Sequence, residues 1–438
     1  MRPRLKSDTF YIPVENGVYF RNNERAFVMQ GKTLATWMER LAPLLDGRYD
    51  LTHLAQNLSP EKQTMVVKLV NILAEQGFVK DVSTDQPHTL SADIQQTYAP
   101  AITFIDYHLD SGASRFQKFL DMPVLAIGSG DALVALAHAL LETGNRHIHL
   151  LDVGEERTDY ERIANLLAML QADRDAGLTL STITVSDWND DENFKRILAS
   201  FKMVVYFSTG ASLSLVDRLA SFCYQAGVLF LPAILVGKQV IIGPTQRSEA
   251  PGCWQCFWRR WQSAQDVRVD DEPGALLPPA SAPPVQPGAT AIGLTANLLA
   301  FECFKQGTDI HSGTLDGQAY VLGLERLESA MHRVYPHPLC TICAAPYVAS
   351  SDQLEAEIAI LQQRDTSQQA RELVWHAEQW TDACAGIFTR IHEQDFSQLP
   401  LVQSQVTVAA PCASALTTAS AARNIASTRV SQSVGLVQ

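Results

Sequence analysis

The sequence predicts an α/β protein in two parts: an N-terminal winged-helix module, then a doubly wound, mainly parallel sheet that carries a four-cysteine site. Three observations predict this. Short strand-like runs followed by three helical runs fill positions 1–82, and strands and helices alternate after them. Two CxxC pairs, GCWQC and LCTIC, stand far apart in the second half. At 438 residues the chain is long enough for two or three domains.

The composition is that of an ordinary globular protein, with 46% hydrophobic and 18% charged residues. A formal net charge of -13 disfavours binding to nucleic acids or anionic membranes. The first residues, MRPRLKSDTF, lack the apolar core of a signal peptide, and the longest apolar run, VLFLPAILV, is too short to span a bilayer. We therefore expect a cytoplasmic protein with no nucleic-acid or membrane partner.

Residues 1–82 carry the pattern of a winged helix. The runs FYIPV, GVYF and RAFVM predict strands, three helical runs follow, and GFVKDV predicts a closing strand. The helices are expected to end at Gly47 and Gly77, and Ser-Pro-Glu at 59–61 is expected to begin the third helix.

The rest of the chain divides by composition. Residues 83–98 are polar and aperiodic, which predicts a linker, and residues 99–350 show the alternation typical of parallel βαβ units. ILVGKQVIIGP predicts a hairpin, AYVLGLERL a strand, and the Pro-rich segment 267–289 a mobile crossing loop. We expect a helical extension over 351–395. The low-complexity tail, 396–438, is expected to be disordered or to dock on a partner.

The segment VLAIGSGDALVALAHAL is a strand that passes through GSG into a helix, as a nucleotide-binding unit begins. Gly128 and Gly130 supply the first two positions of G-x-G-x-x-G, but Leu133 stands at the third. We expect Asp131 to cap the helix, so that its carboxylate takes the N–H groups that a phosphate would use. Asp152 lies where a ribose-binding acid belongs. This predicts a vestigial nucleotide loop, and we expect no ATP on this chain.

The two CxxC pairs are the most specific chemical signal. Cys253 and Cys256, with Cys340 and Cys343, offer four thiolates to one ion, which is the donor set of a structural zinc site. A closed four-thiolate site has no position for water, so the zinc is expected to tie loops together and to catalyse nothing. Redox or disulfide use of the pairs is the alternative.

The four single cysteines are expected to be buried packing residues or inert thiols: Cys223, Cys303, Cys384 and Cys412.

The order of these features resembles the ThiF-like, ubiquitin-activating-enzyme-like superfamily, whose active members adenylate a carboxylate. The resemblance rests on GSGDAL, HIHLLD, VVYFSTG, the predicted hairpin and the CxxC pairs. Where the family has Asp-x-Asp, Asp152 is followed by Val153 and Gly154, and Ser208 or Thr209 stands at the magnesium position. These departures imply a lost activity and no catalytic residue in this chain.

Residues 1–82 resemble the PqqD-like RiPP recognition element, which binds leader peptides of ribosomally made natural products. Together, the two parts are similar to the leader-binding partner of YcaO cyclodehydratases, in RiPP biosynthesis such as bacteriocin maturation. The resemblance covers roughly residues 8–347. It implies a noncatalytic subunit of an azoline-forming complex, whose partners are a precursor peptide and a YcaO enzyme. The resemblance also allows a flavin dehydrogenase in the same complex and a homodimer of this chain.

The predicted peptide site lies between a strand edge and the third helix of the module. RAFVM is the expected edge, with Arg25, Phe27 and Met29, and an extended peptide would add to it as a further strand. The helix carries two apolar stripes; the one with Met65, Leu69 and Ile72, beside Lys68, is expected to line a groove. The alternative is that both stripes are buried.

We therefore expect a chain that binds the leader and presents it to a YcaO-type, ATP-dependent cyclodehydratase that forms thiazoline or oxazoline rings. An active ThiF-like adenylating enzyme, which uses ATP to activate a carboxylate, is the main alternative. A nicotinamide-dependent reductase is the third.

Overall fold

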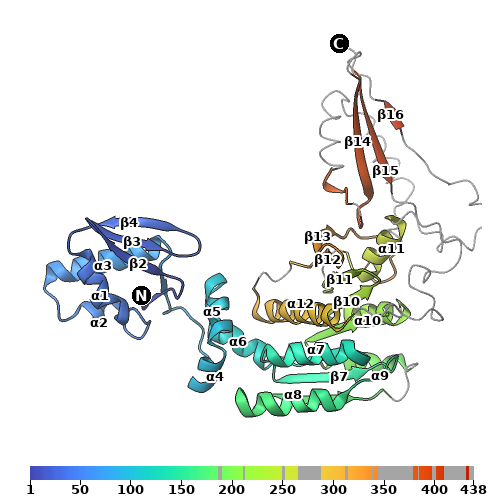
Figure 1. Cartoon of the computed structure of the whole chain (residues 1–438), viewed down its shortest axis with the longest axis horizontal. Helices are drawn as coiled ribbons and strands as arrows, with labels where there is room; N and C mark the ends of the chain where they lie inside the picture. Colours follow the sequence, from blue (N-terminus) through green and yellow to red (C-terminus); the bar gives the residue numbers. More distant parts are fainter. Residues whose placement is uncertain are drawn as a thin grey trace, which may run out of the picture. The chain divides into compact units, whose positions relative to one another are not determined.

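The computed structural model describes residues 1–185, 190–210, 213–248, 252–264, 288–310, 314–337, 340–343, 378–382, 384–396, 401–408 and 431–433. The chain divides into two compact units. Unit 1 comprises residues 1–120 with 307–310, and unit 2 comprises residues 121–306 with 311–438 (Figure 1).

Unit 1 begins with an antiparallel sheet followed by short helices. Its elements are β1 (Pro3–Leu5), β2 (Phe10–Val14), β3 (Gly17–Arg21), β4 (Ala26–Gln30), α1 (Leu34–Leu41), the 3-10 helix η1 (Ala42–Leu44), α2 (Leu51–Ala55), α3 (Pro60–Glu75), β5 (Val79–Asp81), α4 (Ala92–Thr97), α5 (Ala99–His108) and α6 (Gly112–Leu120). The order β2-β3-β4 forms one sheet, and β1 pairs with β5. The predicted strands and helices of this unit are present, and β1 is an additional strand.

The core of unit 1 lies between the sheet and α3. Val66, Val70 and Leu73 of α3 are buried together with Val18 and Phe20 of β3. The helix begins at a proline in its first turn, as Ser-Pro-Glu predicts. One apolar face of α3 therefore holds the module together.

The predicted linker, 83–98, is partly helical, because α4 occupies Ala92–Thr97 and begins at Ser91, whose hydroxyl accepts the Ile94 N–H. Residues 99–120, expected in the second domain, lie in unit 1. Asp106 of α5 explains this placement, since it accepts hydrogen bonds from Lys80 and Arg4.

Unit 2 is built on an eight-stranded sheet of order β13-β12-β11-β10-β9-β6-β7-β8. Its strands are β6 (Val124–Gly128), β7 (His147–Asp152), β8 (Thr179–Ile183), β9 (Met203–Ser208), β10 (Leu229–Val236), β11 (Gln239–Ile242), β12 (Gln318–Gly323) and β13 (Glu328–Arg333). The pairs from β8 to β10 are parallel, and the pairs from β10 to β13 are antiparallel. The predicted β10–β11 hairpin and the strand AYVLGLERL are present.

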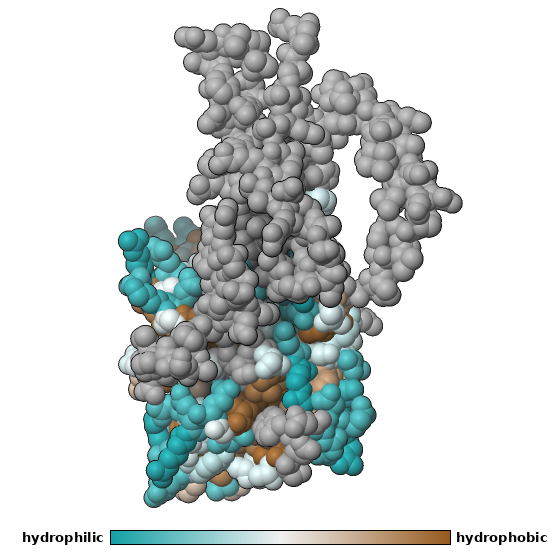
Figure 2. Space-filling view, turned by 90° about the vertical axis from the view of Figure 1, so that its right-hand side faces the viewer, coloured by the Kyte–Doolittle hydropathy of each residue, from teal (hydrophilic) through white to brown (hydrophobic). Residues whose placement is uncertain are grey.

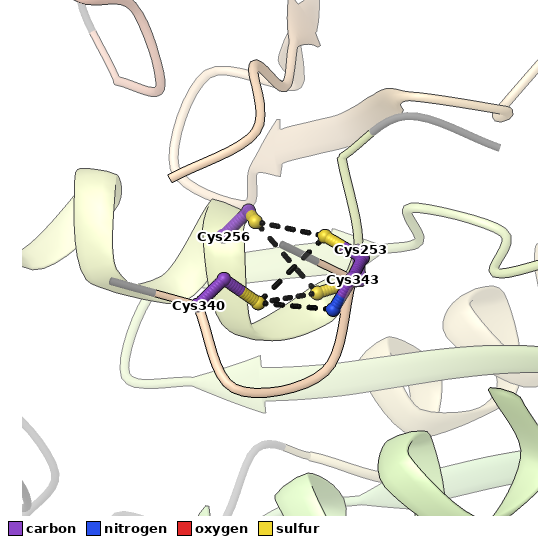
Figure 3. Close-up of side chains that lie close together, drawn as sticks. All are labelled: Cys253, Cys256, Cys340 and Cys343. Atoms are coloured by element: carbon purple, nitrogen blue, oxygen red, sulfur yellow. Dashed lines mark hydrogen bonds between the residues drawn. The ribbon is translucent and has the colours of Figure 1, made fainter. Parts of the chain in front are cut away.

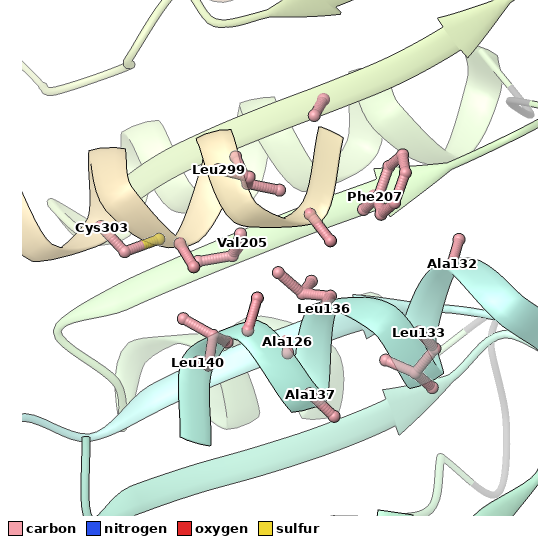
Figure 4. Close-up of a cluster of buried hydrophobic side chains, with 14 of the residues drawn as sticks. Ala126, Ala132, Leu133, Leu136, Ala137, Leu140, Val205, Phe207, Leu299 and Cys303 are labelled. Atoms are coloured by element: carbon pink, nitrogen blue, oxygen red, sulfur yellow. The ribbon is translucent and has the colours of Figure 1, made fainter. Parts of the chain in front are cut away.

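Helices cover both faces of this sheet, as a doubly wound fold requires. They are α7 (Gly130–Glu142), α8 (Tyr160–Asp173), α9 (Asp191–Ala199), α10 (Leu213–Ala226), α11 (Trp254–Ala264) and α12 (Ala289–Thr308). Figure 4 shows α7 and α12 over one face, where Leu136 and Leu299 meet Val205 of β9. A second cluster, with residues of α9, α10 and α11, fills the other face.

The C-terminal part differs from the prediction where it is described. β14 (Phe388–Phe396), β15 (Leu401–Val408) and β16 (Ser431–Ser433) form a three-stranded antiparallel sheet. The end of the predicted helical extension is thus a strand, because main-chain pairing with β15 replaces a helix. Residues 351–377, most of the predicted crossing loop, and Cys412 lie outside the described residues.

In the described part of the chain, no helix is both long and apolar enough to cross a bilayer. Figure 2 shows one face of the molecule on which hydrophilic residues surround a smaller apolar area.

Candidate functional site

The glycine loop lies at the point where the strand order of the parallel sheet reverses. β6 leads outward to β7 and β8 on one side, and β9 and β10 follow on its other side. Ligands of open α/β sheets bind at such a reversal, beyond the carboxyl ends of the strands. A Cβ added to Gly128 would lie 2.6 Å from the Phe207 carbonyl oxygen, so the close approach of β6 and β9 requires glycine there.

The loop is filled from within the chain. The Gly130 N–H donates to the buried Thr158 hydroxyl at 2.9 Å. Gly130 has a positive φ of 56°, and a Cβ on it would lie 2.4 Å from the Glu156 carboxylate. A phosphate would have to displace Thr158 and approach Glu156, whose negative charge would repel it. The loop therefore keeps the glycine turn, and its polar groups are already in contact with residues of the same chain.

The expected cap by Asp131 is wrong. Asp131 lies in the first turn of α7, and the cap position belongs to Ser129, whose side chain makes no capping hydrogen bond; the Gly130 N–H is bonded to Thr158 instead. Its carboxylate is largely exposed and lies 4.0 Å from Arg162. Leu133 is fully buried against the sheet, so the third glycine position has become a core position.

Asp152 is also engaged locally. Its carboxylate accepts the Gly154 N–H at 2.8 Å and the Tyr160 hydroxyl at 3.0 Å. Burial, and then the bond to Asp152, raises the pKa of Tyr160 to about 12. Ser208, one of the two residues expected at the magnesium position, accepts the Gly210 N–H through its hydroxyl at 3.1 Å.

The four cysteines of the CxxC pairs come together at the start of α11 (Figure 3). Cys253 immediately precedes this helix and Cys256 lies in its first turn, whereas Cys340 and Cys343 come from a turn that follows β13. The Sγ–Sγ separations are 3.4 Å for Cys253–Cys340 and Cys256–Cys343, and 3.7 Å within each CxxC pair. Four thiolates at a Zn–S distance of about 2.3 Å form a tetrahedron with edges of about 3.8 Å. The residues therefore fit a tetrahedral metal ion.

Backbone donors surround these sulfurs. The His337 N–H donates to Cys256 Sγ at 3.1 Å, and the Ile342 N–H to Cys340 Sγ at 3.4 Å. Such donors stabilise negative charge on sulfur. Hydrogen bonding with Cys256 raises the pKa of Cys253, and hydrogen bonding with Cys253 lowers that of Cys340.

Trp254 is fully buried and stacks on Trp258 at 5.7 Å between ring centroids. Both belong to the core around the cysteines, so they are packing residues.

The predicted peptide-binding strand is an edge. β4 pairs with β3 on one side only, and it is the outermost strand of its sheet in the described chain (Figure 1). The Asn22 N–H donates to the Arg25 carbonyl, and the Gly31 N–H to the Asn16 carbonyl. By alternation, Phe27 and Met29 bond to β3, so the main-chain groups of Ala26, Val28 and Gln30 point away from the sheet.

The opposite edge, β2, is different because it contains Pro13. Pro13 lies opposite Val18, whose main chain bonds to β4, so the proline nitrogen faces outward. A proline nitrogen donates no hydrogen bond, and proline at an outward position blocks strand addition. Of the two edges of this sheet, β4 is the uninterrupted one.

The predicted stripe on α3 is only partly available. Leu69 is 5% exposed and belongs to the core, so it cannot line a surface groove. Met65 and Lys68 are exposed, and Ile72 is half-buried. Phe27 and Met29 are half-buried against the same core, and Arg25 is exposed. Leu69, predicted to line the groove, therefore belongs to the buried face of α3.

Neither a family model nor a curated protein matches the chain. Among solved structures, a heterocyclase in complex with substrate and cofactor is similar, with a TM-score of 0.58 and 14% identity over 94% of this chain and 49% of that chain. The heterocyclase TruD gives 0.54 and 16% over 89% and 49%. E. coli MccB, solved with ATP, gives 0.54 and 15% over 78% and 99%.

These similarities show that the chain has the α/β fold of the heterocyclases and MccB. The chain spans about half the length of the heterocyclases it resembles. Because the match to the first heterocyclase covers 94% of this chain, it includes residues of both units.

Sequence reasoning missed Glu156 and Thr158, the residues that fill the glycine loop. Their signal is weak: both follow the strand HIHLLD in the polar stretch VGEERTDY, and neither type is diagnostic. Pro13 was visible inside a predicted strand and could have distinguished the two sheet edges.

Proposed function

We propose that this chain binds the leader of a ribosomally made precursor peptide and presents it to a YcaO-type, ATP-dependent cyclodehydratase that forms thiazoline or oxazoline rings. The observation that carries the proposal is the free edge of β4, next to an edge that Pro13 blocks. The fold shared with heterocyclases and MccB supports a peptide as the ligand.

The leader would add to β4 as a fourth strand. Its main chain would pair with Ala26, Val28 and Gln30, and alternate side chains would contact the half-buried Phe27 and Met29. Met65 and Ile72 of α3 provide further apolar contacts in this proposal. Arg25 and Lys68 are cations that suit an acidic leader.

Unit 2 is proposed as the docking partner of the YcaO enzyme, with no chemistry of its own. The filled glycine loop supports this role, because the Gly130 N–H already has Thr158 as its acceptor. The ring-forming step is assigned to the YcaO partner, which activates a backbone amide oxygen of the core peptide with ATP. Tethering the leader raises the effective concentration of every core residue near that partner.

The ion at the cysteine quartet is proposed to be Zn²⁺. Four thiolates fill a tetrahedron, so the ion would join the start of α11 to the turn at 340–343 and leave no position for water. A flavin dehydrogenase that oxidises the rings, and a dimer of this chain, complete the proposed complex.

The test uses the full chain and the N-terminal half of a Cys/Ser/Thr-rich peptide encoded beside its gene, labelled for fluorescence polarisation. Val28→Pro removes one outward N–H and no bond to β3, so we expect peptide affinity to fall about 10-fold or more. Val28→Thr keeps the N–H and should bind within about threefold of the original chain. Circular dichroism checks that both variants fold.

Equal binding by the two variants, or no binding by the original chain, would contradict the proposed site. The absence of any such peptide gene would count against the function itself. With a YcaO partner present, ring formation is followed by mass spectrometry as the loss of one water per ring.

An adenylating enzyme is the second candidate, favoured by the match over 99% of MccB, a protein solved with ATP. It predicts ATP–pyrophosphate exchange by the isolated chain in the presence of the peptide. Exchange above background would support this function; its absence, with peptide binding retained, supports the noncatalytic role.

A further inference from the structure

A second group of metal-ligand side chains lies in unit 2 and contains none of the four quartet cysteines. His332 is on β13, and Asp382 and Cys384 follow much later in the chain. One ligand atom from each residue lies within 4.8 Å of the others. His332 Nδ1 is 2.8 Å from one oxygen of Asp382 and 3.1 Å from the other. Both side chains are largely buried, at 12% and 14% exposure.

The main chain fixes the carboxylate. The N–H groups of Cys384 and Ala385 both donate to one Asp382 oxygen at 2.8 Å, and the Gly386 N–H donates to the Asp382 carbonyl. Ala385 is fully buried. Backbone bonds of this kind orient a ligating carboxylate in metal sites.

Arg260 of α11 holds the two segments that carry the cluster. Its guanidinium donates to the carbonyls of Tyr335 and Pro336, each at 2.9 Å, just after β13. It also donates to the Gly386 carbonyl at 3.4 Å, two positions after Cys384. The cluster is therefore preorganised by contacts outside its own side chains.

We propose that His332, Asp382 and Cys384 form a second site for a divalent transition-metal ion of the zinc class. An imidazole nitrogen, a carboxylate oxygen and a thiolate are all zinc donors. Three protein ligands leave one tetrahedral position for water or an added ligand, unlike the closed quartet. The ion would fasten Asp382 and Cys384 to β13.

A plain ion pair is the competing arrangement. Hydrogen bonds with Asp382 and then with Cys384 raise the pKa of His332 to about 10, so an imidazolium paired with the carboxylate, with the thiol as a further neighbour, is the alternative to a metal ion. Metal content separates the two arrangements.

The experiment counts ions bound to the full chain. Protein stripped with a chelator is reloaded with Co²⁺ or Zn²⁺ and weighed by native mass spectrometry. We expect two ions per chain. His332→Gln keeps a polar side chain beside Asp382, and Cys384→Ala removes the thiol; each should reduce the count from two to one. Cys223→Ala, a buried thiol elsewhere, should keep two.

Cobalt absorption identifies which site is lost. A four-thiolate ion absorbs strongly in the sulfur charge-transfer region, so His332→Gln and Cys384→Ala should keep most of this band. One ion in the original chain, unchanged in both variants, would overturn the proposal and leave the ion pair. A count of two that survives Cys384→Ala would overturn it as well, since the second ion would then lie elsewhere.

Discussion

The glycine loop and the cysteine quartet are both built like ligand sites, yet they differ in what their polar groups already contact. In the loop, the Gly130 N–H is bonded to Thr158, and Glu156 lies against the turn. In the quartet, four sulfurs face one another at 3.4–3.7 Å. The first N–H of the loop is already bonded within the chain, whereas the four sulfurs form a donor set that a tetrahedral ion would fit.

The largest effect is expected at the quartet. Cys340→Ser should lower the free energy of unfolding by roughly 4 kcal/mol or more, because the segments at 253 and 340 would lose the proposed common ion. Urea unfolding measures this, with bound zinc as a second readout. Cys303→Ala, a buried single cysteine, should cost less, roughly 1 kcal/mol. Equal losses would mean that the four cysteines act only as packing residues.

The next effect tests the shape of the loop. Gly128→Ala should cost about 1–3 kcal/mol, because the new Cβ would meet the Phe207 carbonyl of the neighbouring strand. Gly210→Ala is the matched control, since nothing lies within 4 Å of its added Cβ. Thermal unfolding compares the two. If Gly128→Ala were neutral, the close approach of β6 and β9 would not depend on glycine.

A smaller effect tests whether the loop is filled. Thr158→Ala leaves the Gly130 N–H without its acceptor and should cost about 1–2 kcal/mol, while Thr158→Ser keeps the hydroxyl and most of the stability. Neither variant should gain ATP binding, because Glu156 remains. Titration with a fluorescent ATP analogue checks this. Binding by Thr158→Ala would show that one hydroxyl alone excludes the nucleotide.

The smallest effect is expected at Asp131. An exposed carboxylate in the first turn interacts only with the helix dipole and weakly with Arg162, so Asp131→Asn should change stability by less than about 1 kcal/mol. The change should shrink further in high salt. A salt-independent loss of about 2 kcal/mol would instead restore the capping role expected from the sequence.

Local patterns predicted much of the fold, because the information lay within short windows. The strand run FYIPV, the Ser-Pro start of α3 and the alternation from β6 onward all appear in the structure. β1 was not predicted, since so short a strand is defined by its partner β5, which comes only after α3 in the chain. β13 was missed for a similar reason: its residues are mostly polar and exposed, and its pairing with β12 decides its conformation.

The candidate sites also differ in whether local sequence patterns could predict them. The CxxC spacing alone brought out all four cysteines, because each pair is a local motif. Thr158 reaches the glycine loop because the chain turns back after β7, and no motif spacing in the sequence predicts that turn. On α3, periodicity identified two stripes but not which one faced inward, and Leu69 proved to be core.

Pro13 has a consequence for self-association. A sheet with two open edges can add copies of itself without limit, which leads to fibres. With β2 blocked by Pro13, two chains can join through this sheet only from β4 to β4, and that contact uses the open edge of each. Any such assembly is closed at two copies, and a bound peptide strand would prevent even that.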